Sequence, residues 1–117
     1  MAGTFTHMEL YSKNVKKVKS FYRSMFQWKM KDLPDMGYTM ITAGDGIGGG
    51  MSKTQKAKDP SHWVPYVTVA NVDASVKKAK KLGGKVLMPA MDLPGPKIRI
   101  CIIADPAGAP CGLLQSL

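Results

Sequence analysis

The chain carries the same pattern twice, and this repeat is the strongest constraint on its fold. An alternating apolar segment at residues 4–10 leads through Asn14 into a lysine-rich helical pattern, and residues 63–69 lead through Asn71 into a second one. Alternation predicts a strand, and apolar residues three or four apart predict an amphipathic helix. An asparagine at the junction can cap the helix. A repeat of this length indicates two copies of one structural module.

The remaining segments follow in the same order within each module. Helices are expected at residues 15–26 and 72–82, and three further strands follow each of them. These strands are residues 28–33, 38–43 and 48–53, then 85–91, 97–104 and 110–115. Turns rich in glycine, proline and aspartate separate them. The order βαβββ, found twice, predicts an α+β chain in which module one covers about residues 1–55 and module two about 62–117.

Composition excludes several classes of protein. With 117 residues, 44% of them hydrophobic, the chain can form a single domain with its own core and no disulfide bonds. No apolar run is long enough to cross a bilayer and no signal-peptide pattern is present, so we expect a cytoplasmic protein without a membrane partner. Cys101 and Cys111 do not form a CxxC motif. Two free thiols are expected, although neighbouring strands could bring them together.

The net charge of +9 comes mainly from lysines, many of them on the two predicted helices. Specific base readout favours arginine, and only Arg23 and Arg99 are present. No aromatic platform lies between the lysines, as nucleic-acid stacking would require. We therefore interpret the lysines as solvated helix faces and expect no nucleic-acid partner. The charge favours a neutral or anionic ligand over a cationic one.

Three motifs resemble the vicinal oxygen chelate superfamily, which includes glyoxalase I, extradiol dioxygenases, and fosfomycin- and bleomycin-resistance proteins. They are His7 to Trp28 with the pair Phe21-Tyr22, Asn71 to Val86 with Leu82-Gly83-Gly84, and Asp105 to Gln115 with Asp105-Pro106. Their order and spacing cover nearly the whole chain. The resemblance implies two βαβββ modules whose mixed sheet curls into a cup, the glyoxalase/bleomycin-resistance-type fold, and commonly a homodimer.

The resemblance also implies a divalent metal in the cup, held by His and Glu side chains from the first and last strands of each module. His7 stands at the first-strand position of module one. Counted from the capping asparagines, the matching residue of module two is Val64, and Gly112 stands where metal-binding relatives carry Glu. Residues 48–50 are glycines and offer no ligand. His7 is the only retained ligand position, so we expect no metal or other cofactor, unless a slipped register recruits His62.

His7 and Glu9 form the predicted catalytic or binding pair. They are two residues apart on one strand and therefore share a face. The resemblance places that face inside the cup, where the pair could act in acid–base chemistry or orient a ligand. The alternative is a purely structural pair, or a Glu9 that meets a lysine or Arg99.

Further ligand contacts are predicted from the apolar and aromatic side chains. Nine methionines are present, and methionine can line an adaptable apolar pocket, although core filling is the other interpretation. Tyr66 is two residues from Val64 and could donate a hydrogen bond into the cup. The predicted ligand-binding residues are Tyr66, Trp28, Met51, Val64 and Gly112. Together they indicate a mainly apolar pocket with a few polar groups.

Two functions are consistent with this pattern. The first is a glyoxalase/bleomycin-resistance-like protein that binds a small organic molecule without the usual metal. The second is a glyoxalase- or isomerase-like lyase in which a metal or the His7/Glu9 pair polarises a carbonyl group and moves a proton. Sequestration of bleomycin is disfavoured because that antibiotic and this chain are both cationic. The sequence does not separate an enzyme from a binding protein.

Overall fold

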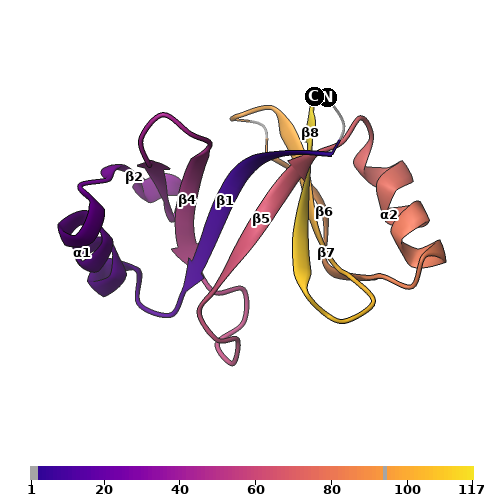
Figure 1. Ribbon diagram of the computed structural model, residues 1–117, viewed down its shortest axis with the longest axis horizontal. Helices are drawn as coiled ribbons and strands as arrows, with labels where there is room; N and C mark the ends of the chain where they lie inside the picture. Colours follow the sequence, from indigo (N-terminus) through magenta and orange to yellow (C-terminus); the bar gives the residue numbers. More distant parts are fainter. Residues whose placement is uncertain (1–2, 94) are drawn as a thin grey trace. The chain divides into compact units, whose positions relative to one another are not determined.

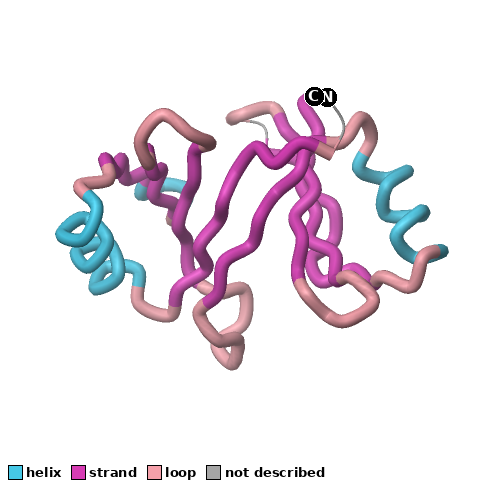
Figure 2. Tube along the Cα trace, in the orientation of Figure 1, coloured by secondary structure: helices cyan, strands magenta, loops and turns pink. Residues whose placement is uncertain are grey.

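The sequence repeat folds as two copies of the order strand, helix, three strands. In the computed structural model, which describes residues 3–93 and 95–117, the chain forms two units. One unit is residues 7–64, and the other joins residues 3–6 to residues 65–93 and 95–117. Each unit has one α-helix beside its strands (Figures 1 and 2). Among the helices of the described residues, none has the length and apolar character needed to span a bilayer.

The unit of residues 7–64 contains helix α1 and four strands, of which β1 begins three residues before the unit. The elements are β1 (Thr4–Ser12), α1 (Val15–Phe26), β2 (Lys29–Leu33), β3 (Tyr38–Thr42) and β4 (Gly48–Lys53), with a short 3₁₀ helix at Pro34–Met36. Strand β4 pairs with β3 in antiparallel and with β1 in parallel orientation. The parallel register sets His7 opposite Gly48 and Glu9 opposite Gly50. This mixed pairing brings the first and last strands of the module side by side.

Helix α1 begins where its sequence predicts. The Asn14 Oδ1 atom accepts a hydrogen bond from the Lys17 backbone N–H at 3.1 Å, which satisfies one donor of the first turn. The apolar stripe of the helix packs on one face of the sheet against Leu10, Ile41 and Met51, which are at most 4% exposed. This packing fixes one face of β1 as the core face, and the alternation of the strand turns its other face away from the helix.

The second unit repeats the arrangement with β5 (His62–Thr68), whose first three residues still belong to the unit of residues 7–64, and with α2 (Val72–Lys81), β6 (Lys85–Leu93), β7 (Ile98–Ala104) and β8 (Pro110–Ser116). Strand β8 pairs with β5 in parallel and with β7 in antiparallel orientation. Asn71 caps α2 by accepting a hydrogen bond from the Ala74 N–H at 2.9 Å. The core of this unit is formed by Val72 of α2 together with Cys101 and Leu113 of the strands. The predicted α+β fold of two βαβββ modules is thus confirmed.

Element boundaries differ from the sequence prediction by a few residues at some strand ends. The sequence pattern predicts that these strands end at residues 10 and 91, whereas β1 continues to Ser12 and β6 to Leu93. Pairing with β4 up to Lys53 keeps the end of β1 extended. Cys101 and Cys111 are free thiols, and burial raises the pKa of both.

Candidate functional site

A cluster of three polar side chains lies on the face of β1 that points away from α1. The buried Glu9 carboxylate accepts two hydrogen bonds at the same oxygen, Oε1. One comes from His7 Nε2 at 2.7 Å, with the proton assigned to that nitrogen, and the other from the Tyr38 hydroxyl at 2.8 Å. The Tyr38 oxygen is also 3.1 Å from His7 Nε2. We call His7, Glu9 and Tyr38 the polar cluster.

Tyr38 reaches the cluster by crossing a neighbouring strand. It starts β3, while Glu9 lies on β1, and β4 runs between these two strands. The β4 residue at the crossing point is Gly50, on which a Cβ atom would overlap the Tyr38 hydroxyl group. Gly50 therefore provides the space in which Tyr38 meets Glu9.

The environment of the cluster keeps Tyr38 as a hydrogen-bond donor. Burial raises the pKa of the Tyr38 hydroxyl above its ordinary value, and the neighbouring Glu9 carboxylate raises it further. The two donors in turn compensate the cost of burying the carboxylate. The His7 side chain is 27% exposed and that of Glu9 only 7%, so His7 is the member of this pair that can meet a ligand.

In the second unit, too, a tyrosine packs against a glycine of the neighbouring strand. Tyr66 of β5 lies opposite Gly112 of β8, and a Cβ atom on Gly112 would overlap the Tyr66 ring. Tyr66 is only 3% exposed and Val64 is fully buried. Gly112 thus makes room for the Tyr66 ring at the position where metal-binding relatives are expected to carry a carboxylate.

The structure brings only part of the predicted site together. His7 and Glu9 are in direct contact, whereas Trp28 and Met51 belong to the core on the α1 side of the sheet. Met51 has no exposed surface, and it follows Gly50 in β4, so strand alternation turns it to the opposite face from the polar cluster. These two predicted ligand contacts therefore lie apart from the predicted acid–base pair.

Arg99 and His62, which the sequence suggested as further members of the site, bind other partners in the structure. Arg99, considered as a partner for Glu9, binds Asp92 and Asp73 within the second unit, each at 2.7 Å. His62, considered as a recruited metal ligand, makes a 2.8 Å hydrogen bond from Nδ1 to the Pro60 carbonyl oxygen. Its ring also stacks on Tyr11 with 5.4 Å between the ring centroids. Arg99 as the partner of Glu9 is therefore wrong: the β6–β7 register sets it opposite Asp92, and Asp73 of α2 binds it as well.

Sequence reasoning missed the role of Tyr38. The glycine run at residues 48–50 was a usable signal, because glycine in a strand often marks a close approach. The approaching group at Gly50 is a side chain of the neighbouring strand. Which side chain this is depends on the β3–β4 register, in which Tyr38 pairs with Ser52, two residues from Gly50.

The residues present do not fit the divalent metal that the family resemblance implied. Within the described part of the chain, no group of three or more His, Cys, Asp or Glu side chains could hold a metal ion. His7 and Glu9 supply two donors, and these already bind each other. The strand beside them contributes Gly48 and Gly50, while Gly112 lies against the Tyr66 ring.

Comparison with known proteins gives one family and several relatives. Residues 4–111 match the model of the Glyoxalase/Bleomycin resistance protein/Dioxygenase superfamily. The chain is 36% identical over 121 residues to "Putative glyoxylase CFP32" of Mycobacterium tuberculosis, covering 97% of this chain and 46% of that protein. It is 28% identical over 124 residues to "Anthracycline biosynthesis protein DnrV" of Streptomyces peucetius, covering 92% and 45%. The chain thus spans about half the length of the curated relatives it matches.

Solved structures with the same fold include two methylmalonyl-CoA epimerases. The enzyme from Mycobacterium tuberculosis matches with a TM-score of 0.66 and 13% identity, over 99% of this chain and 89% of that one. A Streptomyces coelicolor variant in complex with 2-nitronate-propionyl-CoA matches with a TM-score of 0.63 and 16% identity, over 99% of both chains. At these identities the likeness is one of fold.

Proposed function

The chain belongs to the Glyoxalase/Bleomycin resistance protein/Dioxygenase superfamily, and from this premise we propose that it binds a small organic molecule at His7 without a bound metal. The observation that carries the proposal is the contact of Glu9 Oε1 with both His7 and Tyr38. Glu9 is held by two donors of the protein itself. Glu9 then orients the imidazole ring of His7, and this ring contacts the ligand.

The charge of the chain narrows the ligand class. A net charge of +9 attracts anions and repels cations, so the ligand is neutral or anionic. A carbonyl or thioester oxygen can accept a hydrogen bond from the imidazole when the ring is protonated. Acyl-CoA thioesters combine such an oxygen with negative charge, and a protein of the same fold was solved with one of their analogues. They are therefore the first compounds to test.

Binding is tested by thermal shift and calorimetric titration with propionyl-CoA, methylmalonyl-CoA and free CoA. The expected result is saturable binding of a thioester that is at least tenfold weaker in His7→Ala. His62→Ala removes the only other histidine of the chain and serves as the matched control. Equal binding by wild type and His7→Ala would show that the ligand site lies elsewhere.

Metal independence is tested by elemental analysis of protein purified without chelators. We expect less than one tenth of an equivalent of any divalent transition metal, and ligand binding that EDTA leaves unchanged. A stoichiometric metal, lost together with ligand affinity in His7→Ala, would refute this part of the proposal.

A second candidate function is proton transfer next to a carbonyl group. The 2.7 Å contact of His7 with Glu9 favours it, because a carboxylate beside an imidazole stabilises the imidazolium that forms when the ring takes a proton. In this reaction His7 removes a proton from the carbon beside the carbonyl and returns it to the same or the neighbouring carbon. Deuterium uptake from D₂O into methylmalonyl-CoA, or turnover of the methylglyoxal–glutathione hemithioacetal, measures it. Unchanged rates in His7→Ala would exclude this role.

We also propose that the chain forms a homodimer, as members of its superfamily commonly do. Light scattering coupled to size-exclusion chromatography measures the mass in solution. A mass of one chain at micromolar concentration would contradict the proposal.

A further inference from the structure

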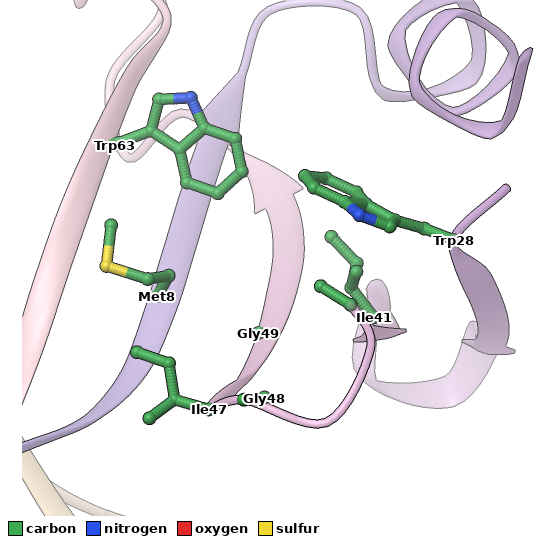
Figure 3. A pocket seen from close by; sticks show the side chains of 9 residues that line it. Met8, Trp28, Ile41, Ile47, Gly48, Gly49 and Trp63 are labelled. Atoms are coloured by element: carbon green, nitrogen blue, oxygen red, sulfur yellow. The ribbon is translucent and has the colours of Figure 1, made fainter. Parts of the chain in front are cut away.

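A cavity opens on the opposite face of the strands that carry the polar cluster. It has a volume of about 440 Å³ and belongs entirely to the unit of residues 7–64. Met8 lies between His7 and Glu9 in β1, so strand alternation turns its side chain to the α1 side of the sheet. Figure 3 shows Met8, Ile47, Trp28 and Trp63 gathered around this space. The cavity is therefore separate from the site of the proposed function.

Two indole rings form walls of the cavity at a right angle. The centroids of Trp28 and Trp63 are 6.5 Å apart and their planes meet at 90°. Tyr22 of α1 braces both of them, stacked on Trp28 at 5.2 Å and edge-on to Trp63 at 5.8 Å. Since these rings are already held by neighbours, a ligand that contacts them orders few additional side chains.

The floor of the cavity is bare backbone. Gly49 pairs with Met8 across the β1–β4 ladder. A Cβ atom at Gly49 would lie 2.8 Å from the Met8 carbonyl oxygen, so this position excludes a larger residue. A flat group can approach such a floor closely.

The chemistry of the lining selects the ligand. Its described residues are methionine, tryptophan, isoleucine, alanine and glycine, and none of them carries a charge. Perpendicular indoles favour a flat aromatic ring, which can stack on one and meet the edge of the other. A cation could also bind an indole face, but the net charge of +9 opposes it. The volume falls within the range of small-molecule pockets.

We propose that this cavity is a second ligand site, which takes a neutral, planar aromatic molecule. The proposal goes beyond the proposed function, because it uses another face of the sheet and none of the polar cluster. Tryptophan emission should report whether the cavity is occupied, because Trp28 and Trp63 are the only tryptophans in the chain.

Dansylamide is the test probe, because it is neutral and planar and accepts energy from excited tryptophan. Titration should give saturable quenching of tryptophan emission together with sensitised dansyl emission. Ile47, 42% exposed at the cavity, allows a charge to be introduced at low risk to the fold. Ile47→Asp should weaken binding at least tenfold, and Ala43→Phe, which fills the space, should do the same. Circular dichroism and thermal midpoints establish that both variants fold.

The matched control is Met40→Asp. Met40 is 48% exposed and precedes Ile41 in β3, so it lies on the opposite face from the cavity. Dansylamide should bind this variant as it binds wild type. Dansylglycine should bind wild type at least fivefold more weakly than dansylamide, because its carboxylate would lose water in a lining that offers no charged partner, and this local cost outweighs the long-range attraction of the net charge. Three results would overturn the proposal: no saturable quenching, equal affinity of Ile47→Asp and wild type, or conversion of a dimer into monomers by Ile47→Asp. The last would mean that a second copy of the chain covers the cavity.

Discussion

The two units differ in how a tyrosine ring comes to lie over a glycine of the last strand. Five residues before each helix cap stand Glu9 in one unit and Tyr66 in the other, and each faces a glycine of the last strand, Gly50 or Gly112. In both units a tyrosine ring lies over that glycine. In the first it is Tyr38, which arrives from β3 and brings its hydroxyl to Glu9. In the second unit the ring over the glycine is that of Tyr66, which is the residue opposite the glycine.

This difference explains why the first unit has the contact between Glu9 and a tyrosine hydroxyl. A tyrosine that comes from the far strand leaves the first strand free to carry a carboxylate, so ring and carboxylate meet. A tyrosine on the first strand takes the place of the carboxylate. The glycines are needed in either case, and a ligating Glu at Gly50 or Gly112 would compete with the ring for the same space.

The largest expected effect is that of Gly112→Ala. The new methyl group would overlap the body of the Tyr66 ring, which is 3% exposed and cannot move away into solvent. We expect the free energy of unfolding to fall by about 3 kcal/mol, the upper part of the range for overpacked cores. Urea unfolding followed by circular dichroism measures it. In the double variant Gly112→Ala/Tyr66→Ala the loss should be clearly smaller than the sum of the two single losses, and additive losses would show that the overlap with the Tyr66 ring is not the cause.

Gly50→Ala should cost less than Gly112→Ala. Here the added atom meets the end of the Tyr38 side chain, its hydroxyl group, and Tyr38 is not fully buried. The ring can swing aside, at the expense of its hydrogen bond to Glu9, so we expect about 2 kcal/mol. If the two alanine variants lose equal stability, the asymmetry between the units is smaller than the contacts indicate. Ligand affinity at His7 should fall as well, because Glu9 loses one of its two donors.

Tyr38→Phe isolates the hydroxyl group from the ring. The substitution keeps the packing over Gly50 and removes the 2.8 Å hydrogen bond to Glu9. A hydrogen bond to a charged group contributes about 1.5 kcal/mol, and the free energy of unfolding should fall by that amount. Tyr22→Phe is the control, since the Tyr22 ring acts by stacking on Trp28. Equal losses in the two variants would mean that the hydroxyl of Tyr38 adds nothing specific.

The fold was predictable from the sequence to a greater extent than the site. Alternation and the caps at Asn14 and Asn71 are local signals, and local signals define the elements. The His7–Glu9 contact was predictable for the same reason, because both lie on one strand. The partner of Glu9 was not, since Tyr38 reaches it across β4 and only the strand register decides this. The β6–β7 register likewise sets Arg99 opposite Asp92 and not near Glu9.

The smallest expected effect is a loss of stability at alkaline pH that depends on Tyr38. Burial and Glu9 hold the pKa of its hydroxyl above the ordinary value of 10.0 in the folded chain. The unfolded chain therefore releases this proton first, so the contribution of Tyr38 is complete below pH 10 and declines as the pH rises above it. At about pH 11 the loss is about 1 kcal/mol relative to about pH 9. Other tyrosines can contribute too, so the measured quantity is the difference between wild type and Tyr38→Phe across this range. Parallel pH profiles of the two proteins would show that Tyr38 ionises as readily in the folded chain as in the unfolded one, and the comparison between the units would then rest on packing alone.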